Sequence, residues 1–150
     1  MSQSFILLDT GPLGMITNRP GNPECQAIQQ WSNTLSDRIL LPEISDYELR
    51  RELIRAKKLR GLRQLDQLKT SILYLPITTQ TMLKAAELWA KARNQGNSTA
   101  PPDALDGDVI LAAQALILEE QGHNTIIVTT NVGHLSRFTT VLTWREIPIE

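Results

Sequence analysis

The chain has 150 residues, of which 41% are hydrophobic and 21% are charged, and its net charge is −1. These values are typical of a soluble globular protein and exclude a disordered or fibrous chain. The single cysteine, Cys25, excludes an intrachain disulfide and a multi-thiolate metal site. No apolar run has the length of a membrane span, and no secretory signal precedes the first strand. We therefore expect residues 1–150 to form one cytoplasmic domain with no membrane association.

Four apolar residues at 5–8 are followed by Asp9 and a Gly/Pro turn. Such a run predicts a strand buried on both faces of a parallel sheet. Asp9 then lies at the carboxyl end of that strand, where α/β sheets bind ligands. Alternatively, Asp9 or Thr10 only caps a short helix that Pro12 would help to start. Both interpretations stay open at this point.

Helix-like and strand-like segments alternate along the rest of the chain. The spacing of apolar residues predicts helices over 22–37, 43–58, 62–72 (after a break at Gly61) and 79–93, and a last long helix opened by Asp106 and Asp108 and ended by Gly122. Strands are predicted at 38–42, 71–76, 125–129 and 139–143, a mobile loop at 94–102, and a further helical turn opened by Thr130 and Asn131. This alternation predicts an α/β, three-layer fold with a mainly parallel sheet of four to five strands flanked by helices.

Positive charge is concentrated in one segment. Residues 50–69 carry eight Lys/Arg against two Asp/Glu, in the order Arg50, Arg51, Arg55, Lys57, Lys58, Arg60, Arg63 and Lys69. This basic stripe can neutralise phosphates, or it can be an ordinary solvated helix face.

Several enzyme classes lack their motifs in this chain. The turn after the first strand is not a glycine-rich phosphate loop, and no Gly-x-Ser-x-Gly elbow is present. His123 and His134 are too few for a histidine-rich metal site. A nucleotide cofactor, a serine nucleophile and a histidine metal centre are therefore not expected.

Carboxylates instead occupy the ends of the predicted strands and the starts of the helices. Taken singly, each has a structural explanation: residues 45–48 fit a capping box, Asp106 fits an N-cap, Asp108 fits a favourable position at the helix dipole, and Asn131 fits a cap. Taken together, they converge on one edge of the sheet, because helices that follow parallel strands start on the same edge. Gathered carboxylates repel one another unless a cation neutralises them, and ligation by oxygen alone favours Mg²⁺ or Mn²⁺.

The order of these motifs resembles that of a PIN domain, and more closely that of VapC-like toxins of type II toxin–antitoxin pairs. The resemblance is carried by residues 8–10, Glu48, residues 108–113 and residues 128–131. It implies a Mg²⁺- or Mn²⁺-dependent endoribonuclease that forms a homodimer and is held inactive by a cognate antitoxin. Asp9, Glu48 and Asp108 match the family's acidic residues. Asn131 stands where a fourth polar or acidic residue is expected, which leaves Asp106 as a candidate for the missing charge.

The implied reaction is hydrolysis of an RNA phosphodiester bond at an ion held by Asp9, Glu48 and Asp108. Thr10 and Thr129 are expected to bind phosphate or to orient a carboxylate, and single-stranded or looped RNA is the expected substrate. For the antitoxin, a row of leucines at 59, 62, 65 and 68 offers a groove, although the same leucines fit ordinary core packing.

Two other functions are weighed against this one. A non-catalytic PIN-like domain that binds RNA or protein is favoured by the uncharged Asn131. A phosphotransferase with Asp9 as nucleophile is disfavoured, because Gly11 stands where such enzymes carry a second acid.

Overall fold

The computed structural model describes residues 4–95 and 102–149, with the side chains of residues 102–104 left aside. Its sheet has five strands: β1 (Phe5–Leu8), β2 (Ile39–Pro42), β3 (Leu73–Leu75), β4 (Thr125–Val128) and β5 (Val141–Leu142). They lie in the order β3-β2-β1-β4-β5, and every neighbouring pair is parallel. The predicted α/β fold with a parallel sheet is thereby confirmed.

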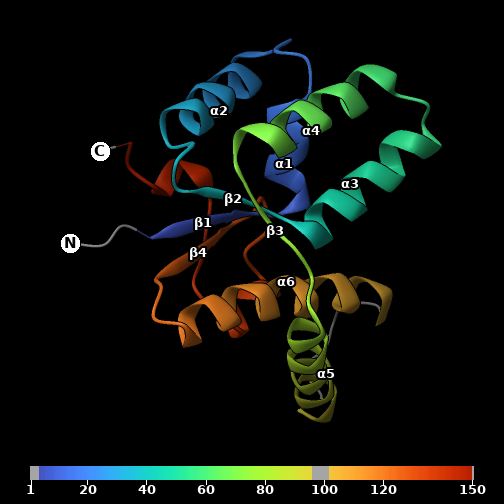
Figure 1. Cartoon of the computed structure of the whole chain (residues 1–150), viewed down its shortest axis with the longest axis vertical. Coiled ribbons are helices and arrows are strands. Elements are labelled where there is room, and N and C mark those ends of the chain that lie inside the picture. The colour runs from blue at the N-terminus through green and yellow to red at the C-terminus, as the bar shows by residue number, and fades with distance from the viewer. Residues whose placement is uncertain (1–3, 96–101, 150) are drawn as a thin grey trace.

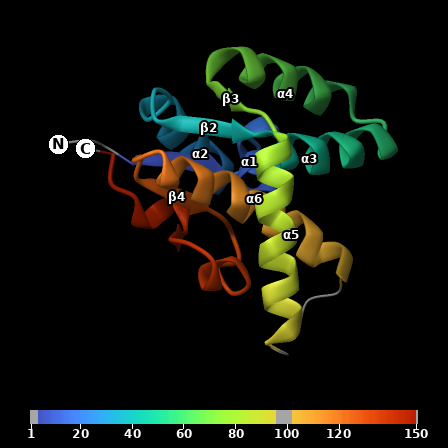
Figure 2. The same ribbon diagram turned by 60° about the horizontal axis from the view of Figure 1, so that its bottom comes forward.

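Helices cover both faces of this sheet, so the fold has three layers (Figure 1). On one face lie α1 (Thr10–Thr17), α2 (Pro23–Thr34), α3 (Glu43–Arg55) and α4 (Leu59–Ser71), and on the other lie α5 (Thr79–Asn94) and α6 (Pro102–Glu120). Two short 3₁₀ helices, η1 (Leu135–Arg137) and η2 (Trp144–Glu146), flank β5 in the chain. Figure 2, turned by 60°, shows α5 crossing in front of α6.

Alternation of side chains along β1 explains why both faces need a helical layer. Ile6 and Leu8 pack into the core beneath α1, α2 and α4, whereas Leu7 packs into the core beneath α6. All three side chains are fully buried. A strand whose residues are apolar at consecutive positions is stable only when both faces are covered, as the unbroken apolar run predicted.

The direction in which the chain leaves β1 determines where a ligand can bind. From the central β1 the chain first builds β2 and β3 on one side of the sheet, and then returns to build β4 and β5 on the other. In open α/β sheets ligands bind outside the carboxyl ends of the strands where such a reversal occurs, and in this fold the reversal lies between β1 and β4. Asp9 directly follows β1, and Thr129 directly follows β4.

Helix boundaries match the prediction at most positions and differ most at α6. Asn22 caps α2 through its side chain, and Gly122, with a φ of +96°, follows the end of α6 in the left-handed region that favours glycine. The predicted loop at 94–102 is shorter than expected, because Asn94 ends α5 and Pro102 begins α6. Its central part, 96–101, lies outside the described residues.

Part of the leucine row at 59–68 packs against the core, the ordinary role considered for it, and its role as an antitoxin groove stays a prediction. Leu65 is fully buried, and Leu68 packs against the same core, whereas Leu59 has 65% of its surface exposed.

No helix in the described part of the chain is both long and apolar enough to cross a bilayer.

Candidate active site

Asp9 is held from two sides at the carboxyl edge of the sheet. Its Oδ1 atom accepts a hydrogen bond of 2.8 Å from the backbone amide of Thr10, which caps α1. Its Oδ2 atom accepts a hydrogen bond of 2.7 Å from the hydroxyl of Thr129, which is buried at the end of β4. Thr129 therefore orients the carboxylate, one of the two roles expected for it.

Glu48 reaches the same edge from the second turn of α3. Its Oε1 atom accepts a hydrogen bond of 3.0 Å from the hydroxyl of Thr10, so Thr10 also orients a carboxylate. The capping box expected at residues 45–48 is wrong: α3 begins at Glu43 after Pro42, which forms no side-chain cap. Because β2 leads directly into α3, Glu48 lies beyond the first turn and is free to face α1.

A glycine on α6 makes room for the Glu48 carboxylate. A Cβ atom added to Gly107 would overlap Oε2 of Glu48, so the carboxylate rests directly against the helix backbone beside Asp108. Because α6 begins at Pro102, Asp106 and Asp108 lie in its second turn, so the N-cap role considered for Asp106 and the first-turn dipole role considered for Asp108 are wrong. Sequence analysis missed Gly107, although a glycine inside a helical pattern signals a close approach.

The pKa values of two carboxyl groups show that the acids share one electrostatic environment. Burial, followed by the charge of Asp9, raises the pKa of Asp108 to about 6, with a further rise from Glu48 and opposition from His134 and Arg137. Burial is also the main cause of the raised pKa of Glu48, to which Asp9 adds. The hydrogen bond from Thr10 opposes that rise. Three carboxylates from three elements therefore repel one another here.

Two other predicted site residues lie at the margin of this group. Asp106 is exposed and lines a cavity of about 400 Å³ between α5 and α6, together with Met82 and Trp89. Asn131 is exposed, and its Oδ1 atom accepts a hydrogen bond of 3.2 Å from the amide of Gly133. The helical turn expected to open at Thr130 and Asn131 is wrong, because η1 begins only at Leu135.

The donor atoms of these residues suit a hard divalent ion, but the spacing of the side chains does not. Across residues 4–95 and 102–149, no three His, Cys, Asp or Glu side chains are grouped tightly enough to hold a metal ion. The donor set of Asp9, Glu48 and Asp108 is nevertheless all oxygen, the preference of Mg²⁺ and Mn²⁺. The raised pKa values of Glu48 and Asp108 indicate negative charge that a cation would relieve. An ion would have to draw these carboxylates closer together than they lie here.

The basic stripe divides into paired and unpaired cations. Arg50 forms ion pairs with Asp46 and Asp66 at 3.0 and 2.8 Å, and Arg55 pairs with Glu52 at 2.8 Å. Arg51 and Lys69 lie over the rings of Tyr47 and Tyr74. Five cations of the stripe have no carboxylate partner among the described residues: Lys57, Lys58, Arg60, Arg63 and Lys69.

Comparison with known proteins places this geometry in context. The family model of the PIN domain matches residues 6–138. One similar fold is a chain of VapBC2 from Rickettsia felis bound to a DNA fragment from their promoter, with a TM-score of 0.70 and 15% identity over 93% of this chain and 98% of that one. A chain of VapBC-1 from nontypeable Haemophilus influenzae has a TM-score of 0.67 and 19% identity over 95% of this chain and 99% of that one. A chain of DNA-bound VapBC from Salmonella typhimurium has a TM-score of 0.64 and 21% identity over 95% of this chain and 99% of that one. A comparison with curated protein sequences gives no significant match.

Proposed function

The chain belongs to the PIN domain family, and from this premise we propose that it is a divalent-metal-dependent endoribonuclease that hydrolyses RNA phosphodiester bonds. The observation that carries the proposal is the electrostatic coupling of Asp9, Glu48 and Asp108 at the carboxyl edge of the sheet. Carboxylates that repel one another at a ligand-binding edge lower the stability of the fold, and a bound cation removes that penalty.

Each side chain has a distinct role in this mechanism. Asp9, Glu48 and Asp108 would hold Mg²⁺ or Mn²⁺, while the hydroxyls of Thr10 and Thr129 orient two of these carboxylates. The chemistry that such an ion supplies when bound is polarisation of the scissile phosphate and a lower pKa for an attacking water. Three ligands suffice for this mechanism. Asp106, two residues before Asp108 on α6, points to a different side of the helix and is not required.

RNA cleavage by the purified protein tests the proposal. We expect a labelled single-stranded RNA to be cut with Mg²⁺ or Mn²⁺, to survive in EDTA, and to be cut again when the ion is restored. Asp9→Asn and Asp108→Asn should each lower cleavage by about 100-fold or more, because each removes a ligand charge. Asn is a good helix cap, so Asp9→Asn should still fold. Asp37→Asn is the matched control, since Asp37 is exposed and precedes β2 at the opposite edge of the sheet. Wild-type cleavage by either site variant would refute the proposal.

We further propose that the chain is the cytoplasmic toxin of a toxin–antitoxin pair and acts as a homodimer. The similar folds in VapBC structures support the pairing with an antitoxin. Met82 and Trp89, exposed beside the apolar cavity on α5, support a dimer. Induced expression should arrest growth, and coexpression of the cognate antitoxin should relieve the arrest. The Asp9→Asn variant should not arrest growth, and light scattering should give twice the mass of 16.8 kDa.

A non-catalytic domain that binds RNA or protein is the second candidate. Two observations favour it: no ready-made metal-binding group among the described residues, and an uncharged Asn131 at the fourth position. RNA binding that is unchanged by EDTA, with no cleavage under any divalent ion, would establish this alternative.

A further inference from the structure

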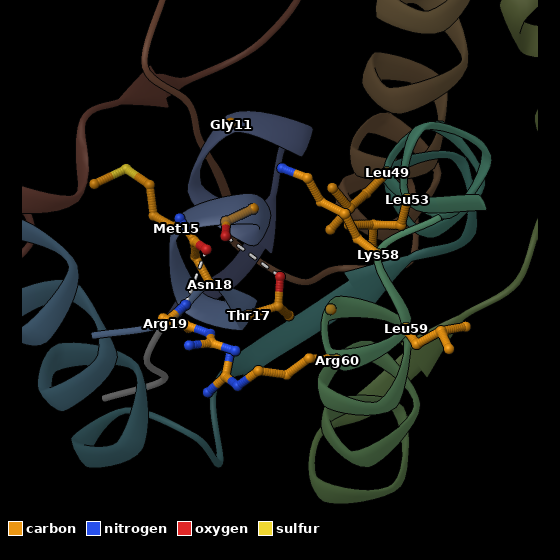
Figure 3. Close-up of a pocket in the computed structure, with 12 residues that line it drawn as sticks. Gly11, Met15, Thr17, Asn18, Arg19, Leu49, Leu53, Lys58, Leu59 and Arg60 are labelled. Atoms are coloured by element: carbon orange, nitrogen blue, oxygen red, sulfur yellow. Dashed lines mark hydrogen bonds between the residues drawn. The ribbon is translucent and has the colours of Figure 1, made fainter. Parts of the chain in front are cut away.

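Two adjoining cavities form one cleft that starts beside the candidate active site. The first, of about 620 Å³, lies between α1 and the turn that joins α3 to α4, and its wall begins at Gly11, two residues after Asp9 (Figure 3). The second, of about 350 Å³, lies among α1, α2 and α4. The cavities share the lining residues Thr17, Asn18 and Arg60, so they adjoin each other, and the two are called the cleft below. Together the two cavities extend from Gly11 on α1 toward α2.

The first cavity is positively charged. Arg19, Lys58 and Arg60 line it, and no Asp or Glu is among the described residues that line either cavity. None of these three cations pairs with a carboxylate in the part of the chain that the structure describes. Figure 3 shows Arg19, from the segment that follows α1, and Arg60, from α4, extending toward each other, and Lys58 extending toward the side that carries Gly11. In a chain with a net charge of −1, this lining favours an anionic ligand.

The second cavity is lined by amide side chains. Gln29 helps to build its wall, because its Nε2 atom donates to the carbonyl oxygens of Met15 and Asn18 at 3.2 and 2.9 Å. The amides of Asn33, Gln64 and Gln67 form no hydrogen bond among the described residues, and each retains both a donor and an acceptor. An amide with both groups available can form two hydrogen bonds to the edge of a base.

We infer that this cleft binds the RNA strand next to the scissile phosphate. Lys58, Arg60 and Arg19 contact the backbone, and a base enters the amide-lined cavity, where Gln64 and Gln67 determine sequence preference. The inference rests on the proposed ribonuclease function and adds to it a site of recognition. An acidic peptide would satisfy the cations but not the paired donors and acceptors of the amides, so RNA fits the whole cleft better.

Binding measured in EDTA separates recognition from cleavage. Fluorescence anisotropy with four labelled 12-nucleotide homopolymers of A, C, G and U gives both affinity and preference. We expect Arg60→Glu to weaken binding by about tenfold or more, the effect of losing a phosphate contact and reversing its charge. Arg63→Glu is the matched control, because Arg63 lies on the same helix, is exposed and lines neither cavity. Gln64→Ala and Gln67→Ala should reduce the differences among the homopolymers, whereas Gln80→Ala on α5 should not.

Each outcome supports or overturns the inference. Equal weakening by Arg60→Glu and Arg63→Glu would reduce the effect to general charge and overturn it. Equal affinity of the wild type for all four homopolymers would overturn base recognition. Binding of an acidic helical peptide by the wild type, with no binding of RNA, would overturn the inference as well. Arg60→Ala replaces Arg60→Glu if circular dichroism shows that the reversal unfolds the chain. RNA that binds in the cleft but is not cut with Mg²⁺ would refute the ribonuclease alone, and cleavage without dependence on the cleft would refute the inference alone.

Discussion

Substitution of Gly107 by alanine tests the placement of Glu48 without removing any carboxylate. The added Cβ would overlap Oε2 of Glu48 and force that side chain away from α6. Alanine in place of glycine inside a helix stabilises the fold by about 1 kcal/mol. Loss of the hydrogen bond from Thr10 to Glu48 costs about 1 kcal/mol. This is less than for a fully buried charged group, because the Glu48 side chain is 26% exposed and water can replace the lost donor. The two effects nearly cancel, so the free energy of unfolding should change by less than about 1 kcal/mol.

Activity should respond far more strongly than stability. Displacement of a metal ligand or its support lowers affinity or activity by about 10- to 100-fold, and we expect a loss of RNA cleavage at the upper end of that range. The assay is cleavage of labelled RNA at several Mg²⁺ concentrations, beside urea unfolding of the same samples. In a Glu48→Ala background the clash disappears. There Gly107→Ala should add about 1 kcal/mol of stability and cause no further loss of activity. Wild-type cleavage by Gly107→Ala, or additive losses in the double variant, would refute the placement of Glu48.

Three more predictions follow from the same contacts. Thr129→Val keeps the shape of a buried side chain but leaves Oδ2 of Asp9 without its donor, and should cost about 1 kcal/mol in urea unfolding and about tenfold or more in cleavage. The pKa of Asp108 is raised from 3.8 to about 6 in the folded protein, so in EDTA the folded protein is more stable when Asp108 carries a proton than when it is ionised. The free energy of unfolding should therefore fall as pH rises from about 4 to 6. The upper limit of this fall is about 3 kcal/mol, and solvent screening of the half-buried Asp108 makes the actual fall smaller. Asp108→Asn should abolish this part of the pH dependence. Mg²⁺ at about ten times its Kd should stabilise the wild type by about 1.4 kcal/mol in thermal unfolding, and Asp9→Asn should lose this gain.

The fold was predictable because its central elements carry patterns that only one environment satisfies. Residues 5–8 form an unbroken apolar run, and in the structure both faces of β1 are buried. Apolar spacing predicted a helix from residue 22, and α2 begins at Pro23 with the side chain of Asn22 as its cap. Local patterns were less informative at α6, where Asp106 and Asp108 were given roles at a helix start that begins earlier, at Pro102. Glycine lowers helix propensity, and the benefit of Gly107 depends on Glu48, which is distant in the sequence.

The choice of site residues came from the resemblance to PIN domains, and it stays a prediction. Chain position put several carboxylates at one edge of the sheet, the resemblance singled out Asp9, Glu48 and Asp108 among them, and the charge coupling among these three is consistent with that choice. The partner of Glu48 was not predictable, because Ser45 satisfies the local capping rule and Thr10 is 38 residues away. Charge along the basic stripe was equally ambiguous, since only the packing of α3 against α4 brings Asp66 to Arg50 and leaves Arg60 for the cleft.

Asp9 shows why a helix cap and a metal ligand are not exclusive interpretations of one carboxylate. Its Oδ1 atom caps α1, and its Oδ2 atom accepts the hydroxyl of Thr129. Each carboxylate oxygen has two lone pairs, so each bonded oxygen retains one for an ion. The amide of Thr10 at the start of α1 and the hydroxyl of Thr129 after β4 together fix the plane of the carboxylate, and such orientation is what a ligand needs before it meets a cation. If Asp9 holds an ion as proposed, the hydrogen bond that caps α1 also positions the ligand.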